Sequence, residues 1–407
     1  MHQVYHLKNQ CYGCGACRNI CPVSAISMEE DEEGFLYPVI RQEKCIDCGM
    51  CKNICPYHGG TGETLSESPC TQTYFAVQHK NPAVVAESSS GGMFTALSDC
   101  VLGCGGIVYG AAFDHAFKVA HERAETQEQR NAFRGSKYIQ SSMDRVYRLI
   151  QEDLEQNRLV LFTGTPCQAA GVRNYILQKR GTLDRLVLCD FICHGAASPK
   201  VWESYLQYFK EKYDGGLTQY AFRNKRNGWK QGAPLLKTKD SDISDEYARK
   251  KSFLQLYRTC YLSRPSCYAC QYAGYSRCSD ITIGDFWNIG SVCPSMDDNT
   301  GTSQVLVNTE TGRKWFDLCR DTIKCCECGK KDVWQPHLEY PANVNFRKRE
   351  KFWENCRTLP FERVLKKYGQ GDIMARCKSF AIPVVKKLGL YVLAGKLYRM
   401  IFVRKEK

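Results

Sequence analysis

Short apolar runs alternate with stretches of helical periodicity along most of this chain, and the alternation is typical of an α/β domain. The apolar runs predict strands at residues 74–77, 106–113, 159–162, 186–192, 281–283 and 305–307. The helical periodicity predicts helices at residues 91–102, 145–156, 166–178 and 200–212. We therefore expect a sheet covered by helices over this part of the chain.

The first 58 residues follow a different pattern, in which cysteines recur at one fixed spacing. The two runs are Cys11-x-x-Cys14-x-x-Cys17-x-x-x-Cys21-Pro22 and Cys45-x-x-Cys48-x-x-Cys51-x-x-x-Cys55-Pro56. In bacterial ferredoxins each such run gives three ligands to one [4Fe–4S] cluster and its fourth ligand to the other. The spacing thus predicts two clusters, one bound by Cys11, Cys14, Cys17 and Cys55 and the other by Cys45, Cys48, Cys51 and Cys21.

Structural zinc sites are the alternative for these cysteines, because Cys-x-x-Cys pairs also bind zinc. A zinc site needs four ligands and no third cysteine at the same repeat, so the pattern favours clusters. Residues 5–58 resemble the two-cluster bacterial ferredoxins throughout.

The length of 407 residues predicts two or three domains. We expect an α+β ferredoxin-like N-terminal domain followed by a larger α/β domain. The predicted segments are a ferredoxin domain at 1–58, a Gly/Ser-rich linker at 59–72, the α/β domain at 73–330 and a C-terminal extension at 331–407.

The formal net charge of +13 is basic. Each cluster with four thiolates offsets roughly two of these charges. A basic surface attracts phosphates, an acidic redox partner or a membrane face, although a solvated surface explains it equally; no nucleic-acid partner is expected. No secretory signal precedes Cys11, so we expect a cytoplasmic protein whose 25 cysteines are reduced or bound to metal.

Further cysteines follow the predicted strands of the α/β domain. Thr163-Gly164-Thr165-Pro166-Cys167 joins a strand to a helix, and Cys193-His194-Gly195 follows the next strand. The carboxyl ends of strands in a doubly wound sheet meet in one crevice, so Cys167 and Cys193 are expected close together. With Cys267 and Cys270 they would supply four thiolates for a third cluster; ordinary buried thiols are the alternative.

A serine- and glycine-rich loop at residues 88–92 opens a predicted helix. Backbone N–H groups at such a helix start favour phosphate, although a serine cap explains the same pattern.

Seven motifs of the α/β region occur in a fixed order. They are Ser-Ser-Gly-Gly at 89–92, Gly-Ser-Lys-Tyr-Ile-Gln-Ser at 135–141, Thr-Gly-Thr-Pro-Cys-Gln at 163–168, Ile-Cys-His-Gly at 192–195, Phe-Arg-Asn-Lys with Gly-Trp at 222–229, Arg-Pro-Ser-Cys-Tyr-Ala-Cys at 264–270 and Asp-Ile-Thr-Ile-Gly-Asp-Phe-Trp at 280–287. Over residues 5–330 the chain resembles the family of coenzyme F420 hydrogenase/dehydrogenase beta subunits, in the bacterial branch with a fused N-terminal ferredoxin.

This resemblance implies an α/β domain that holds FAD beside one [4Fe–4S] cluster. The implied ligands of that third cluster are Cys167, Cys193, Cys267 and Cys270, with Cys278 as an alternative ligand. The implied flavin-binding residues are Gly91 and Gly92 together with Lys137, Tyr138, Gln140 and Ser141 of the 135–141 loop.

The expected activity is that of an oxidoreductase, in which a flavin couples single-electron transfer to hydride chemistry. His194 and Asp285 are the candidate proton donors and acceptors, although a structural histidine and a turn-capping aspartate are the alternatives. Arg223, Lys225, Arg226 and Lys230 could bind a phosphate of the flavin or substrate.

Two other functions are open: an electron-transfer subunit without flavin, and a redox-sensing iron–sulfur protein. The expected partner is a redox protein or a small-molecule hydride acceptor, whose identity the sequence leaves open.

The C-terminal region offers two weaker signals. A metal site built from Cys319, Cys325, Cys326 and Cys328 is disfavoured, because adjacent cysteines strain a tetrahedral site. Residues 382–403 are apolar but carry several cations, so they are too charged to span a membrane. A basic amphipathic helix there would lie on a membrane surface or pack on the domain.

Overall fold

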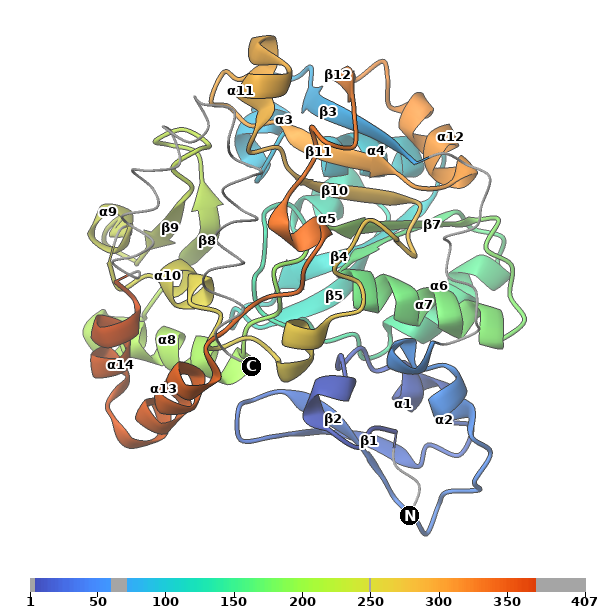
Figure 1. The fold of residues 1–407 in the computed structure, drawn as a ribbon, viewed down its shortest axis with the longest axis horizontal. Helices are drawn as coiled ribbons and strands as arrows, with labels where there is room; N and C mark the ends of the chain where they lie inside the picture. Colours follow the sequence, from blue (N-terminus) through green and yellow to red (C-terminus); the bar gives the residue numbers. More distant parts are fainter. Residues whose placement is uncertain (1–3, 60–71, 249, 371–407) are drawn as a thin grey trace.

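A computed structural model describes residues 4–59, 72–248 and 250–370. Figure 1 shows a small N-terminal part in blue, a large sheet with its helices, and a lobe of helices around a two-stranded sheet. Residues 60–71 of the predicted linker (59–72) and the predicted helix at 382–403 lie outside the described residues.

The N-terminal part repeats one local structure over the two cysteine runs. Helix α1 (Ala16–Ile20) follows Gly15 and helix α2 (Met50–Asn53) follows Gly49, and both glycines have left-handed backbone angles, with φ of 78° and 71°. Glycine adopts this conformation without strain, so the chain can turn sharply around each run. Strands β1 (Ile26–Glu30) and β2 (Leu36–Ile40) pair in a hairpin between the runs, which is compatible with the predicted ferredoxin-like domain.

Eight strands form one mixed sheet in the order β12-β3-β11-β10-β7-β6-β4-β5 (Figure 1). The strands are β3 (Thr73–His79), β4 (Ile107–Phe113), β5 (Val119–Ala124), β6 (Val160–Gly164), β7 (Leu186–Phe191), β10 (Ile281–Asp285), β11 (Ser303–Val307) and β12 (Ile323–Cys328). Neighbours β10, β7, β6 and β4 are parallel, and the other pairings are antiparallel. The carboxyl ends of β6, β7 and β10 therefore meet at one edge of the sheet.

Helices cover both faces of the sheet. They are α3 (Pro82–Glu87), α4 (Met93–Gly103), α5 (Gln127–Asn131), α6 (Val146–Glu155), α7 (Pro166–Gln178) and α12 (Glu310–Leu318). Helices α4 and α12 share a core with one face, and α6 and α7 share a core with the other. The α7 helix begins after a Thr165 capping box with Pro166 at its first position, which fixes where the helix starts.

The second of these cores continues into the N-terminal part. Cys14, Ala16, Ile20 and Ile54 pack in the same cluster as the side chains of α6 and α7. Figure 1 accordingly shows α7 between the sheet and the blue N-terminal part. A shared apolar core joins the two parts, because separating them would expose this surface to water.

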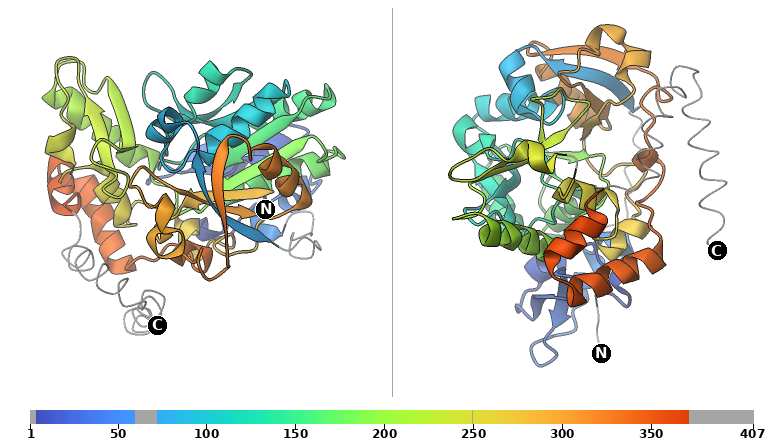
Figure 2. Two further views of the ribbon diagram at one scale, coloured as in Figure 1. Left: turned by 90° about the horizontal axis from the view of Figure 1, so that it is seen from above. Right: turned by 90° about the vertical axis from the view of Figure 1, so that its left-hand side faces the viewer.

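A lobe rich in aromatic side chains packs beside the sheet. It contains α8 (Pro199–Lys212), β8 (Gln219–Asn224), β9 (Ala233–Lys237), α9 (Ser244–Tyr247), α10 (Phe253–Arg258), α13 (Phe346–Thr358) and α14 (Phe361–Tyr368). Figure 2 shows the red helices α13 and α14 against this lobe. Residues 346–368 of the predicted C-terminal extension therefore pack into the core of this lobe.

Short elements complete the described chain. They are η1 (Lys8–Gln10), η2 (Pro56–His58), η4 (Pro265–Ala269), α11 (Ile289–Val292), η5 (Pro294–Met296) and η6 (Pro336–Leu338). Within the described residues, no helix is both long and apolar enough to cross a membrane.

The α/β class and the ten elements predicted from apolar patterning are confirmed, with ends that differ by a few residues. Strands β5 and β12 were not predicted, because charged and cysteine residues interrupt their apolar pattern. The sheet is mixed, since β5, β11 and β12 run antiparallel to their neighbours.

Candidate functional site

The cysteines of the two N-terminal runs line two separate cavities. The outer cavity is lined by Cys21, Cys45, Cys48 and Cys51. The inner cavity is lined by Cys11, Cys14, Cys17 and Cys55. In each cavity the fourth cysteine comes from the other run, which is the same grouping as the spacing predicts.

Backbone N–H groups point at several of these thiols. The N–H of Ala25 donates to Cys21 Sγ at 3.3 Å, and the N–H groups of Ala16 and of Tyr57 lower the pKa of Cys14 and Cys55 respectively, against the stronger effect of burial. Such donors are typical of sites that hold an anionic cluster.

Burial raises the pKa of Cys17 well above its ordinary value, and the neighbouring thiols Cys14 and Cys11 raise it further. Four thiolates in this space are unfavourable without a positive group among them. The iron atoms of a cluster would supply that charge, so the residues of the inner cavity fit a [4Fe–4S] cluster.

Four further cysteines converge at the carboxyl edge of the sheet. Cys167 lies in the first turn of α7 after β6, Cys193 follows β7, and Cys267 lies in η4 with Cys270 immediately after it. Burial is the largest cause of the raised pKa of each thiol. The second largest cause is a neighbouring thiol for two of them: Cys270 raises the pKa of Cys167, and Cys267 raises that of Cys193. The four thiols are therefore electrostatic neighbours, as the third-cluster prediction requires.

Hydrogen bonds hold these thiols in place. The N–H of Gly195 donates to Cys193 Sγ and the N–H of Ala196 donates to Cys267 Sγ, each at 3.4 Å. The Thr165 hydroxyl lies 3.2 Å from Cys167 Sγ.

Arg277 is a buried cation beside this group. Its side chain is 1% exposed and forms an ion pair with the Asp190 carboxylate at 3.8 Å, which is longer than a hydrogen bond. Its Nε, Nη1 and Nη2 have no hydrogen-bond partner among the described residues. The guanidinium lowers the pKa of Cys193 and Cys270, against the larger effect of burial. A buried arginine with unused donors beside four thiols fits an anionic cluster, whose sulfur atoms would accept those donors.

The alternative ligand Cys278 has other neighbours. Its thiol donates to the carbonyl of Pro166 at 3.4 Å. Burial raises its pKa, and the strongest electrostatic effects on it come from Asp190 and Arg277 rather than from a cysteine. Behind burial, Cys270 raises the pKa of Cys167, Cys193 and Cys267, which favours Cys270 over Cys278 as the fourth member of the group.

The two candidate proton carriers, His194 and Asp285, share Arg223 as a neighbour. Burial lowers the pKa of His194 to about 3, with smaller contributions from His337 and Arg223. The ring of His194 stacks on that of His337, with centroids 4.0 Å apart. Asp285 forms an ion pair with Arg223 and accepts from Trp229 Nε1 at 3.2 Å. His194 is therefore neutral near pH 7, while Asp285 is held by two donors.

The loops predicted to border a flavin meet each other. The N–H of Ser136 donates to Ser89 Oγ at 2.8 Å. The side chain of Tyr138 packs between the rings of Tyr257 and Phe222, with centroids 4.5 and 5.3 Å away. Burial lowers the pKa of Lys137 to about 7. This corner of the molecule is cationic and partly apolar.

The backbone structure explains why glycine is needed at two positions of the 88–92 loop. A side chain at Gly91 would collide with the carbonyl of Val77 and the backbone of Ser303, so glycine is needed for β3 and β11 to close over the loop. Gly92 has a φ of 91° before α4. Their smallness is thus explained by backbone packing, independent of any ligand.

Gln140 and Ser141 of the other loop face away from this corner. Gln140 donates to the carbonyl of Tyr12 at 3.1 Å and accepts from Arg264 at 3.0 Å. Ser141 lies 3.0 Å from His121 Nδ1 and accepts from Gln168 at 2.9 Å. Gln140 is thus an interface residue between the N-terminal part and the sheet, a position that the motif did not predict.

The four basic residues that were predicted to bind a phosphate lie in two different environments. Arg223 and Lys225 are partly or largely buried, and Lys225 donates to the carbonyls of Val85 and Ser90. Arg226 and Lys230 pair with aspartates near the surface. Of the disfavoured group Cys319, Cys325, Cys326 and Cys328, the first has its Sγ 3.5 Å from Cys100 Sγ, and the other three lie on β12.

Sequence reasoning missed Arg264, Arg277, His337 and Arg349. Arg264 opens the Arg-Pro-Ser-Cys motif, and this position beside two candidate ligands was the available signal. Arg349 and His337 lie far along the chain from the cysteines and carry no local signal.

Comparison with known proteins adds two matches. Residues 157–330 match a family model that describes the C terminus of the beta subunit of coenzyme F420 hydrogenase/dehydrogenase. Residues 10–58 match a 4Fe-4S dicluster domain. No curated protein matches the chain significantly.

Twelve chains of solved structures match significantly. One belongs to the F420-reducing [NiFe] hydrogenase complex from Methanosarcina barkeri, with 18% identity and a TM-score of 0.45. The alignment covers 72% of this chain and 90% of that chain.

The family recognised from the motifs is confirmed: the chain joins a 4Fe–4S dicluster domain to the C-terminal region of the coenzyme F420 hydrogenase/dehydrogenase beta subunit family. It is an iron–sulfur electron-transfer protein related to a subunit of an oxidoreductase.

Proposed function

We propose that this protein is an iron–sulfur flavoenzyme, an oxidoreductase with three [4Fe–4S] clusters and FAD. When bound, the clusters would supply single-electron transfer and the flavin would supply hydride exchange with a small-molecule substrate. The observation that carries the proposal is the convergence of Cys167, Cys193, Cys267 and Cys270 beside the buried Arg277, whose donors are unused.

The eight N-terminal cysteines would hold the first two clusters. Cys21, Cys45, Cys48 and Cys51 surround the outer cavity, where Cys48 is exposed. Cys11, Cys14, Cys17 and Cys55 surround the inner cavity, where the first three are buried. The outer site is thus accessible to a redox partner protein, and the inner site faces the rest of the molecule.

The inner cavity and the third cysteine group have common neighbours, which supports electron transfer between them. Cys14 raises the pKa of Cys167, behind burial and other neighbours, so the two thiols are close. Tyr12 lines the inner cavity, and its hydroxyl accepts from the N–H of Gln271, the residue after Cys270, at 3.4 Å. Its ring packs on that of Tyr272 with centroids 5.6 Å apart.

The cationic corner around Arg223 is the proposed flavin and substrate site. Arg223 Nη2 is buried and has no hydrogen-bond partner among the described residues. Burial lowers the pKa of Lys225 to about 8 and that of Lys137 to about 7. An anion such as the FAD diphosphate would stabilise these cations, so the residues fit that group.

His194 is the proposed proton carrier of the site. Because burial disfavours the imidazolium, His194 would relay a proton in one step, in which one ring nitrogen accepts a proton as the other releases its own. His194 directly follows Cys193, its ring stacks on His337 and Arg223 lowers its pKa slightly, which supports this role beside the third cysteine group and the Arg223 corner. Asp285 holds Arg223 in position through their ion pair.

One observation favours the alternative of an electron-transfer subunit without flavin. Gly91 is closed against the sheet backbone, and Gln140 and Ser141 bond within the protein. In that alternative the cationic corner would bind a partner protein or a phosphorylated ligand instead.

Anaerobic purification with iron, sulfide and flavin analysis separates these functions. The proposal predicts about twelve irons and one FAD per chain. About twelve irons without flavin would support the electron-transfer subunit, and about eight irons without flavin would contradict both the third cluster and the flavoenzyme. We expect the protein in the cytoplasm, where its thiols stay reduced.

A further inference from the structure

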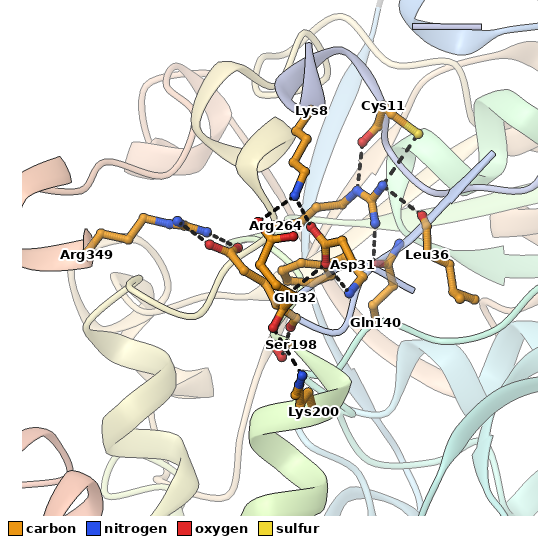
Figure 3. Close-up of polar contacts among 12 residues, drawn as sticks. Lys8, Cys11, Asp31, Glu32, Leu36, Gln140, Ser198, Lys200, Arg264 and Arg349 are labelled. Atoms are coloured by element: carbon orange, nitrogen blue, oxygen red, sulfur yellow. Dashed lines mark hydrogen bonds and ion pairs between the residues drawn. The ribbon is translucent and has the colours of Figure 1, made fainter. Parts of the chain in front are cut away.

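Arg264 crosses the boundary between the N-terminal part and the rest of the molecule (Figure 3). It is 1% exposed. Its Nε donates to the carbonyl of Cys11 at 2.7 Å, and its Nη2 donates to Cys11 Sγ at 3.5 Å and to the carbonyl of Leu36 at 3.0 Å. Nη1 donates to Gln140 Oε1 at 3.0 Å. The guanidinium thus bonds both to a proposed cluster ligand and to the backbone around it.

No carboxylate within salt-bridge reach neutralises Arg264 in the described part of the chain. The nearby acidic residues pair with other cations: Lys8 with Asp31 and Glu32, and Arg349 with Glu33 (Figure 3). The guanidinium lies instead over the ring of Tyr37, 4.1 Å from its centroid. A buried cation without a carboxylate is costly, and the negative charge of a cluster on Cys11 would offset that cost.

The two N-terminal cavities differ in this respect. The outer cavity has one cationic and one anionic lining residue, Lys52 and Asp47, and both are exposed to water. Beside the inner cavity, the buried guanidinium of Arg264 donates a hydrogen bond to Cys11 Sγ. Hydrogen bonds and positive charge at a cluster sulfur stabilise the more negative, reduced state, and burial of the cation strengthens the effect.

We propose that Arg264 raises the reduction potential of the inner cluster and so favours electron transfer from the outer, surface site toward the third cysteine group. The inference rests on the proposed assignment of the two clusters. The same residue continues toward that group, because its carbonyl accepts from the N–H of Cys267 at 2.9 Å. Arg264 acts through Cys11 and is therefore a positioning residue.

Its position depends on a glycine. A Cβ at Gly13 would lie 2.6 Å from Arg264 Nη1 and 2.5 Å from Gln140 Nε2. Only glycine between Cys11 and Cys14 leaves room for the guanidinium beside the ligand loop.

Arg264→Gln in the full-length, cluster-loaded protein tests the proposal by a redox titration monitored by EPR. We expect the wave of one cluster to move to a more negative potential while the other waves stay in place. A Cys48→Ser background assigns the waves, because it alters the outer cluster and leaves the Arg264-sensitive wave. Unchanged potentials in Arg264→Gln would overturn the proposal.

Arg349→Gln is the matched control. It removes the ion pair to Glu33 at the same boundary without touching a cluster ligand, so every wave should keep its potential. An equal shift in this control would contradict the proposal by making the effect structural. If Arg264→Gln fails to load the inner cluster, Arg264→Lys replaces it: the charge stays, the bond to Cys11 is lost, and a smaller negative shift is expected, whereas no shift overturns the proposal.

The iron content of the wild-type protein keeps this test separate from the proposed function. A protein with eight irons still tests Arg264, because both N-terminal clusters are present. A protein with twelve irons and no shift in Arg264→Gln refutes the tuning role alone.

Discussion

At the scale of single residues, the buried His121 links folding to pH. His121 is buried on β5, where Nε2 lies 3.0 Å from the Thr163 carbonyl and Nδ1 lies 3.0 Å from Ser141 Oγ. Burial lowers its pKa to about 4. The unfolded chain would bind a proton at this histidine near its ordinary pKa of about 6.5, so folding is linked to pH.

We therefore predict a pH-dependent stability that His121 causes. Since the folded pKa lies below the unfolded one, the contribution is fully present above about pH 6.5 and is lost as the pH falls to about 4, up to about 3 kcal/mol. Thermal unfolding between pH 7 and 5 should show a smaller loss in His121→Gln than in the wild type. Identical slopes would mean that another group causes the change.

At the scale of elements, α7 joins the cluster-binding region to the sheet. A Cβ at Gly171 in this helix would lie 2.6 Å from the Tyr147 hydroxyl and 3.4 Å from Cys14 Sγ. That hydroxyl donates to the carbonyl of Cys14 at 2.7 Å. The absence of a side chain at this position lets the inner cysteine loop rest on α7.

Gly171→Ala should lower the free energy of unfolding by about 1–3 kcal/mol, because it disturbs a buried hydrogen bond and overpacks the contact. It should also reduce the iron bound at the inner site. The control is Gly103→Ala at the end of α4, where a Cβ would meet nothing within 4 Å; differential unfolding should find it neutral or slightly stabilising. A Gly171→Ala protein as stable as the control would refute the contact.

The sequence predicted those helices and strands that have a clear apolar or capping pattern of their own. The strands at 159–162 and 186–192 are continuous apolar runs, and the helix at 166–178 has a proline and a capping box at its start. Strand β12, Ile-Lys-Cys-Cys-Glu-Cys, has no apolar period, and Ile323 is its one buried residue; the strand pairs with β3 along its whole length. Its pairing is a tertiary effect that a local pattern does not contain.

In the candidate site, too, local spacing was predictable and contacts between distant residues were not. The grouping of Cys21 with Cys45 and of Cys55 with Cys11 follows from spacing within each run, so the sequence predicted it. The partners of these groups come from distant positions: Arg264 is 253 residues from Cys11. Such contacts arise only when the N-terminal part packs on the sheet, and no local spacing records them.

At the scale of the whole molecule, residues far apart in the sequence bond across the boundary between the N-terminal part and the lobe. Arg349 of α13 bonds to Glu33 of the N-terminal part, 316 residues away, with Nη1 2.7 Å from Oε1. Ser198, at the start of α8, donates to the Glu33 carbonyl at 2.5 Å (Figure 3). The hairpin that carries Glu33 is therefore held by two helices of the lobe, α8 and α13.

Removal of one partner from this largely buried ion pair leaves the other charge uncompensated. Arg349→Gln should therefore lower the unfolding free energy by about 3 kcal/mol and speed hydrogen exchange across residues 31–40. Lys351→Gln on the same helix breaks an exposed pair with Glu354 and should change neither quantity measurably. Equal exchange in the two variants would show that the ion pair to Glu33 is unimportant.

In the proposed path, electrons from two N-terminal clusters reach a third cluster at Cys167, Cys193, Cys267 and Cys270. A Mössbauer count of cubane clusters per chain, in the anaerobically purified wild type and in Cys167→Ser, tests this path. We expect three clusters in the wild type and two in the variant, with the N-terminal pair intact. Two clusters in both proteins would contradict the path.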